Sequence, residues 1–251
     1  GNFTFNRNKM LYDDKPSQMW PYLNDVGFPF GQQRALVAMG LFESQEDIDN
    51  SPMQTFGAVR PGDIKYRDID GNGIIDSNDR VPFGCSSIPE INYGFGASIR
   101  WKNWDLSVFF QGAGRVGRMI GGPTVYGAEW SILQQGNFYE EVAENRWTEW
   151  NPDPNAMYPR MSLSNFDNNK QPSSYWWRDM SYLRLKNAEI GYSLSKNIIN
   201  KIGLSTARFY LQGVNLLTFA PFKLWDPELN TSTGGLYPQM RTLSVGLNVN
   251  F

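Results

Sequence analysis

The sequence predicts an all-β protein, a transmembrane antiparallel β-barrel with long extracellular loops, and three observations lead to that fold class. Several segments alternate between apolar and polar residues with a period of two, as a strand with one apolar face does. Aromatic residues are dense, with nine Trp, twelve Tyr and sixteen Phe among 251 residues. Short connections between these segments are followed by long ones, which is typical of barrels in the outer membrane.

The first expected strands lie at the start of the chain and near residue 100. Asn2–Tyr12 is a candidate strand, and Ile91–Trp101 alternates strictly between apolar and small or polar residues. After the two residues 102–103, the run Trp104–Gly112 alternates again, which predicts a hairpin with a tight turn. A tryptophan stands on each side of that turn. This fits an interfacial aromatic girdle, although a tryptophan pair at the end of a soluble hairpin is an alternative.

Three later runs complete the expected sheet. Ser181–Leu194 changes phase near Asn187–Ala188, which predicts a β-bulge, and Ala207–Phe219 follows it. Met240–Phe251 alternates most strictly and ends in an aromatic residue. We expect its apolar residues to face lipid and their even-numbered neighbours to face the lumen; the apolar residues are Leu243, Val245, Leu247 and Val249.

The connections separate an outer-membrane barrel from a soluble sandwich, whose strands alternate in the same way. The connections 13–89, 115–180 and 220–239 are long, whereas 102–103 and 195–205 are short. Barrels have short periplasmic turns and long extracellular loops, so the long connections are expected outside the cell. About six strands are too few, since ~8 is the smallest number that closes such a barrel. Further strands are therefore expected either from sequence that is missing here or from another chain.

Composition excludes several classes of function. Lys and Arg number 23 against 25 Asp and Glu, so no charge imbalance indicates a nucleic-acid partner. There is no histidine, which excludes Ser-His-Asp and Cys-His chemistry, and we expect no catalytic residue and no enzyme activity. The single cysteine, Cys85, cannot form an intrachain disulfide.

The segment 68–79 matches the twelve-residue pattern of a calcium-binding loop. Gly73 stands at the sixth position, where the turn requires positive φ, and Ile75 at the eighth would pack the loop onto its support. The alternative is a solvated turn rich in Asp, Asn and Gly. The sequence predicts a structural calcium ion that clamps the 13–89 loop region, held by side chains and, at Ile74, by the backbone carbonyl; the expected ligands are Asp68, Asp70, Asn72, Ile74, Asp76 and Asp79.

Two features depart from a paired EF-hand. The last ligand position holds Asp79 in place of glutamate, and no amphipathic helix flanks the loop on both sides. Elsewhere, Ser44 is expected to cap a short surface helix. The loop tryptophans Trp176, Trp177 and Trp225 are expected to pack within the loops rather than bind ligand. No residue is assigned to the substrate.

Nine segments, taken in order, carry a family resemblance: GNFTFNRNKMLYDD, GLFESQEDIDNSP, PGDIKYRDIDGNGIIDSNDRVPFG, IPEINYGFGASIRWKNWDLSVFFQGAG, RWTEWNPDPNAMYPRMS, SYLRLKNAEIGYSLSKNII, FYLQGVNLLTF, KLWDPE and LNVNF. In this order they resemble the SusC/RagA-like TonB-dependent outer-membrane transporters. The resemblance runs over nearly the whole chain, so it implies a position in the cell outer membrane.

The resemblance implies a 22-stranded barrel with an N-terminal plug and a TonB-binding segment. Residues 1–251 would form the C-terminal part of the barrel, with the plug and the TonB-binding segment absent from this chain. The implied partners are a SusD-like lipoprotein, the remaining barrel and plug, and the TonB–ExbB–ExbD complex. We expect import of an oligosaccharide in preference to a peptide. The alternative is a soluble, calcium-stabilised, β-rich carbohydrate-binding module.

Overall fold

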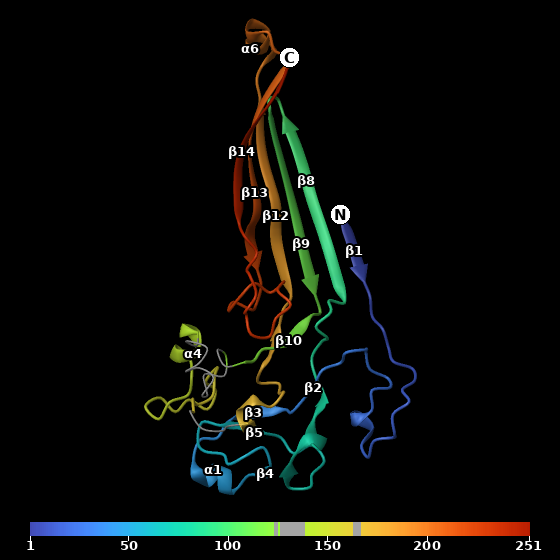
Figure 1. Ribbon diagram of the computed structural model, residues 1–251, viewed down its shortest axis with the longest axis vertical. Coiled ribbons are helices and arrows are strands. Elements are labelled where there is room, and N and C mark those ends of the chain that lie inside the picture. Colours follow the sequence, from blue (N-terminus) through green and yellow to red (C-terminus); the bar gives the residue numbers. More distant parts are fainter. Residues whose placement is uncertain (123–124, 126–138, 163–166) are drawn as a thin grey trace.

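A six-stranded antiparallel sheet forms one end of the computed structural model, which describes residues 1–122, 125, 139–162 and 167–251 (Figure 1). The strands follow one another across the sheet in chain order; they are β1 (Asn2–Phe5), β8 (Ile91–Trp101), β9 (Trp104–Gly114), β12 (Tyr182–Ser193), β13 (Thr206–Phe219) and β14 (Thr242–Asn250). The all-β prediction is confirmed. Within the described ranges, no helix has both the length and the apolar composition needed to cross a membrane.

Strand β1 is shorter than the expected Asn2–Tyr12. It ends at Phe5, after which the Asn6 amide donates a hydrogen bond to the carbonyl of Glu90 at 2.8 Å and the chain leaves the sheet. The next residues, Arg7, Asn8 and Lys9, are all polar, so no apolar alternation continues the strand. The other expected strands agree with the structure within two residues at each end.

The predicted hairpin and bulge are both present. Trp101 pairs with Trp104 across the turn between β8 and β9. The register of β12 shifts between Leu185 and Asn187 against both neighbouring strands, next to the predicted phase change. On β13, Asn215 adopts a φ of 55° opposite this shift, a left-handed conformation that asparagine tolerates better than most residues.

Strand register gives the sheet two different faces, because directly paired residues point to the same side. One row of paired residues crosses five strands and is entirely apolar: Ile99, Leu106, Ile190, Leu211 and Val245. Each of these side chains is exposed, from 42% at Ile190 to 84% at Val245. A neighbouring row toward the short turns consists of Trp101, Trp104, Tyr192, Phe209 and Leu247. An apolar surface thus covers this side of the sheet.

The opposite face is polar. The row between the two apolar rows consists of Arg100, Asp105, Gly191, Tyr210 and Gly246. Arg208 lies on the same face and forms ion pairs with Asp105 and with Glu189, the latter at 2.6 Å. A Cβ atom on Gly246 would lie 2.1 Å from the ring of Tyr210, so glycine is required for this ring to lie flat on the sheet.

Long connections gather at one end of the sheet, while the short ones lie at the other with α6 (Lys196–Ile199), η3 (Asn200–Ile202) and the C-terminus (Figure 1). The 115–180 connection lies partly outside the described residues. The long connections contain paired short strands: β2 (Arg34–Ala35) with β7 (Val81–Pro82), β3 (Ala38–Leu41) with β5 (Ile64–Tyr66), β4 (Met53–Gln54) with β6 (Ile74–Ile75), and β10 (Gly117–Met119) with β11 (Trp177–Asp179).

The long connections 13–89, 115–180 and 220–239 are together called the loop assembly below. Short helices complete them. They are η1 (Pro21–Leu23), α1 (Gln45–Asp49), η2 (Ser77–Asp79), α4 (Glu140–Glu144) and α5 (Asp167–Lys170). The predicted cap is present, since the Ser44 hydroxyl accepts the Asp47 amide of α1 at 3.2 Å.

Most of the buried apolar core lies in the loop assembly rather than in the sheet. Its largest fully buried members, which are less than 2% exposed, include Leu36, Ile64, Tyr66, Tyr158 and Trp176. These residues come from two long connections that are far apart in sequence. The loop assembly is therefore a packed body with its own core, formed by segments that have no common periodicity.

The loop tryptophans pack as predicted. Trp176 is 1% exposed and donates its indole N–H to the carbonyl of Asn169 at 2.6 Å. The Trp177 ring lies edge-on to Phe83, with ring centroids 5.9 Å apart, and Trp225 lies edge-on to Phe222 at 4.7 Å.

Candidate functional site

The turn at 68–79 lies in the loop assembly and is built by its glycines and aspartates. Gly71 and Gly73 have φ values of 76° and 81°, so each needs the freedom of glycine. These positive angles direct the amides of both glycines to Asp68, whose two oxygens accept them at 2.7 and 2.8 Å. Ile75 is fully buried and fastens the turn to the core.

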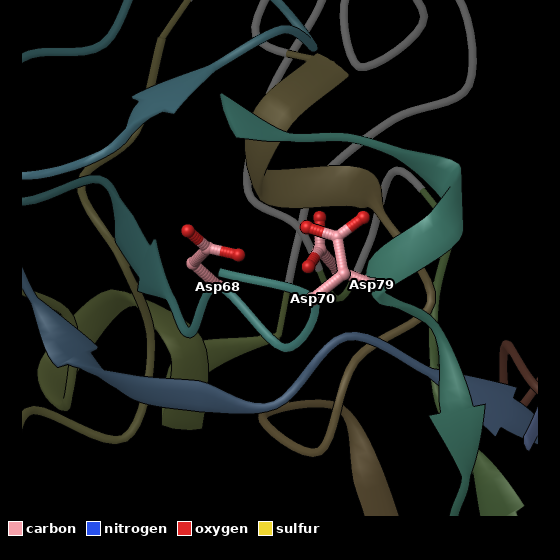
Figure 2. Close-up of side chains that lie close together, drawn as sticks. All are labelled: Asp68, Asp70 and Asp79. Atoms are coloured by element: carbon pink, nitrogen blue, oxygen red, sulfur yellow. The ribbon is translucent and has the colours of Figure 1, made fainter. Parts of the chain in front are cut away.

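Three carboxylates meet inside this turn. Oxygen atoms of Asp68, Asp70 and Asp79 lie within 4.8 Å of one another, and Figure 2 shows their side chains directed to the same side of the loop. Oxygens that bind one calcium ion at ~2.3–2.6 Å can be separated by at most about 5 Å. The spacing of the three carboxylates therefore fits a single calcium ion.

Asp79 closes the turn from within. Its side chain is fully buried, and its two oxygens accept the amides of Ile69 at 2.7 Å and Asp76 at 2.8 Å. A shorter acid than glutamate reaches this position because the 3-10 helix η2 brings Asp79 back over the start of the loop. Each oxygen retains a lone pair that could bind a cation.

The remaining expected ligands are arranged differently. Asp76 is outside the three-carboxylate group and caps η2, accepting the Asn78 amide at 2.6 Å. Asn72 lies beside Asp70, to which its amide nitrogen donates at 3.1 Å, while its oxygen accepts the Ile74 amide. Ile74 lies in β6 with a partly exposed side chain.

Electrostatics show that the turn carries negative charge. Hydrogen bonds from the backbone, above all from Gly73, hold the pKa of Asp68 below its usual value, so its carboxylate remains ionised at neutral pH. Tyr22 lies beside the turn and donates its hydroxyl to the carbonyl of Asn78 at 2.9 Å. Burial raises the pKa of Tyr22, and the carboxylates of Asp70 and Asp79 raise it further.

Ion pairs that are not apparent from the sequence connect its distinctive segments. Arg184 of β12 is 1% exposed and pairs with Asp226 and with Glu228, which joins SYLRLKN to KLWDPE. Arg115 pairs with Glu90 at 2.6 Å, which joins the end of β9 to the residue before β8. The only signal for these pairs in the sequence is an isolated charge beside an apolar run, so their partners could not be identified.

A third pair lies inside the loop assembly. Arg160 contacts the buried carboxylate of Asp63 at 2.7 Å, and Asn169 donates to the same carboxylate at 2.8 Å. Asn169 also accepts the Ile64 amide at 2.8 Å. These residues lie on segments about a hundred positions apart, so the pair fastens two long connections to each other.

No model of a known protein family matches the chain. Two curated proteins from Formosa agariphila do: TonB-dependent receptor P3 is 34% identical over all of this chain and 26% of its own length, and TonB-dependent receptor P26 is 34% identical over 85% of this chain and 22% of its own length. The chain thus spans about a quarter of the relatives that it matches.

Solved structures agree in fold. The RagAB peptide importer in its open-open state matches 99% of this chain and 26% of its own chain, with a TM-score of 0.69 and 22% identity. The closed-closed state of the same importer gives a TM-score of 0.68 over the same share, with 21% identity. The sheet and loop assembly therefore share the fold of part of that importer's chain. The identity to the two curated relatives shows that the chain belongs to the TonB-dependent receptors.

Proposed function

We propose that this chain is part of the barrel of an outer-membrane importer that takes up an oligomeric nutrient. The two-faced sheet carries this proposal. Its apolar face, with the row from Ile99 to Val245, has the composition of a surface in contact with lipid. Its polar face, with Arg208, Asp105 and Glu189, would line a hydrated lumen.

The exposed apolar face also argues against a soluble carbohydrate-binding module. Leu243, Val245 and Leu247 of β14 are each more than half exposed, and a soluble protein rarely presents a contiguous apolar surface of this extent. In a membrane barrel, lipid covers this apolar surface, and further strands pair with the two edges of the sheet. Neither the apolar face nor the backbone groups of the edge strands then remain uncovered.

An oligosaccharide is the ligand that we propose first, driven inward by the TonB–ExbB–ExbD complex with a SusD-like lipoprotein on the outer side. Support comes from the polar inner face and from the packed loop assembly, which offers a firm surface for a partner. A peptide is the second candidate, because the solved structures similar in fold are named peptide importers.

Deletion of the gene should abolish growth on one polymeric nutrient while growth on its monomer persists, because only the polymer fragment needs active import. Growth curves on a panel of glycans and peptides measure this, and a plasmid copy of the gene serves as the control. Normal growth of the deletion strain on every substrate, together with no lipoprotein in the purified complex, would indicate a structural or adhesive barrel.

We also propose that the 68–79 turn holds one calcium ion. Asp68, Asp70 and Asp79 would bind it through carboxylates, with Asn72, Asp76 and the Ile74 carbonyl as the further ligands suggested by the loop pattern. Bound calcium would supply charge neutralisation where three carboxylates meet. The ion would fix the turn and, through the hydrogen bond from Tyr22, the segment around η1.

Chelation of calcium should lower the thermal stability of the loop assembly. A ligand present at a hundred times its dissociation constant stabilises the folded state by ~2.7 kcal/mol. Asp68→Asn should remove this calcium-dependent shift, whereas Asp49→Asn on the exposed end of α1 should retain it. Melting curves with and without millimolar calcium measure the effect, and anomalous scattering locates the ion. A turn that remains empty at millimolar calcium contradicts the proposal.

A further inference from the structure

Strand β10 lies near the end of the sheet at which the long connections gather (Figure 1). An open pocket of about 500 Å³ is lined by residues of β10 and of two other long connections. The 13–89 connection supplies Gln33, Arg34 and Ser87 to its wall, β10 supplies Arg118, and the last connection supplies Asn230, Thr231 and Ser232. Two amides and three hydroxyls therefore surround two guanidinium groups.

The charge of the pocket is one-sided. No carboxylate of the described residues lines it, whereas acidic side chains line two other cavities of comparable size. Arg34 is paired with Asp25 at 3.1 Å, so its charge is compensated. Arg118 has no carboxylate partner within the described ranges, and Arg118 is therefore the cation available to a ligand.

The contacts of Arg118 with the described residues are to neutral groups. One of its terminal nitrogens donates to the carbonyls of Leu229 at 2.9 Å and Thr231 at 3.4 Å. Its Nε atom is buried without a hydrogen-bond partner among the described residues, and so is Oε1 of Gln33 in the same wall. Burial lowers the pKa of Arg118, which reflects the cost of holding a charge there without a counter-ion. An anion would offset that cost.

The other residues that line the pocket indicate which kind of molecule bears the anionic group. Apart from Met119, the side chains that line the pocket end in polar groups, which can form hydrogen bonds with a ligand. Hydroxyl and amide groups exchange hydrogen bonds with the hydroxyls of a sugar in either direction. A guanidinium binds carboxylate or sulfate with strong charge-assisted hydrogen bonds.

We propose that this pocket is a subsite for an acidic oligosaccharide, in which Arg118 binds a carboxylate or sulfate group and the surrounding amides and hydroxyls bind sugar hydroxyls. This inference rests on the proposed import function and narrows its substrate class. A ligand there would contact all three connections, which already meet through hydrogen bonds from Arg118 to the Leu229 carbonyl and from Gln33 to the Gly117 carbonyl, the latter at 3.1 Å.

Calorimetry on the full-length transporter, purified with whatever lipoprotein accompanies it, tests the pocket with four probes. These are oligogalacturonate for the carboxylate, sulfated galacto-oligosaccharide for the sulfate, a neutral oligosaccharide of the same length, and a glutamate-rich peptide. We expect at least one acidic glycan to bind roughly tenfold or more tightly than the neutral one, with an affinity that falls as salt is added.

Variants distinguish binding in this pocket from a nonspecific attraction between the acidic glycan and the charge of the protein. Arg118→Gln should remove the preference for the acidic glycan, Arg118→Lys should restore part of it, and Asn230→Asp should weaken it without removing a wall contact. Lys223→Gln, which removes an exposed charge from the last connection, should leave it unchanged. Equal affinity for neutral glycan, an unchanged preference in Arg118→Gln, or tighter binding of the acidic peptide would each overturn the inference.

Growth assays distinguish this failure from failure of the import function. If deletion abolishes growth on a glycan while the Arg118→Gln strain grows normally at limiting concentration, the importer stands and the pocket assignment is wrong. If deletion has no effect on growth, the import function itself is wrong.

Discussion

Val245→Arg should destabilise the protein by ~2–4 kcal/mol if residue 245 lies near the bilayer midplane, because a charged side chain on the lipid face must be drawn from hydrocarbon toward water. Val245 pairs with Leu211 in the apolar row and is 84% exposed, so the described residues leave most of its side chain uncovered. Urea unfolding of the full-length transporter in lipid vesicles measures the loss.

Ser244→Arg is the matched control, since Ser244 is the adjacent residue on the polar face and pairs with Gln212. An arginine there would enter the lumen side and should cost much less. Equal losses for the two variants, or labelling of cysteines at 244 and 248 by a lipid-soluble reagent, would show that the two faces are assigned the wrong way round.

Asp63→Ala should destabilise the loop assembly by ~3–5 kcal/mol, the usual cost of removing one partner from a buried ion pair. Asp63 is 1% exposed, and its oxygens receive hydrogen bonds from Arg160, Asn169 and the Arg60 amide. Alanine would leave the partly buried guanidinium of Arg160 without the Asp63 carboxylate and would release the Asn169 amide. Resistance of the loops to limited proteolysis measures the effect.

A double variant tests the physical cause. Because part of the cost in Asp63→Ala comes from the unpaired arginine, adding Arg160→Met should recover that part of the lost stability. Asp153→Ala, at an exposed carboxylate of the connection that contains Arg160, should cost little. A double variant less stable than Asp63→Ala alone would mean that packing of the Arg160 stem, and not its charge, supplies the stabilisation.

The strands were predictable because their signal is local. Each alternating run, such as the one that ends at Phe251, records the two faces of the sheet in consecutive residues. The β-bulge was predictable in the same way, since the change of phase near Asn187 is the pattern that a register shift leaves in the sequence. The end of β1 has a local signal too, because Arg7, Asn8 and Lys9 interrupt the alternation, and the expected strand to Tyr12 was wrong in continuing past them.

The loop assembly could not be derived from the sequence, because its contacts join positions that are far apart in the chain. Its core joins residues such as Ile64 and Trp176, more than a hundred positions apart, and its buried polar contacts need partners that no spacing identifies. The turn at 68–79 was identifiable because its acidic residues lie within one short segment. The pocket around Arg118 was not, since three separate connections supply its wall.

The position of the apolar core has a consequence for engineering this protein. In the loop assembly an apolar residue such as Ile75 is enclosed, whereas in the sheet Val245 is presented outward. Replacing exposed leucines and valines with polar residues, the common way to improve solubility, would therefore remove the contact with lipid that we propose for the sheet. Exposure of an apolar residue therefore has a different meaning in the two parts of the chain. Libraries of variants should be scored with one rule for the strands of the sheet and another for the loop assembly.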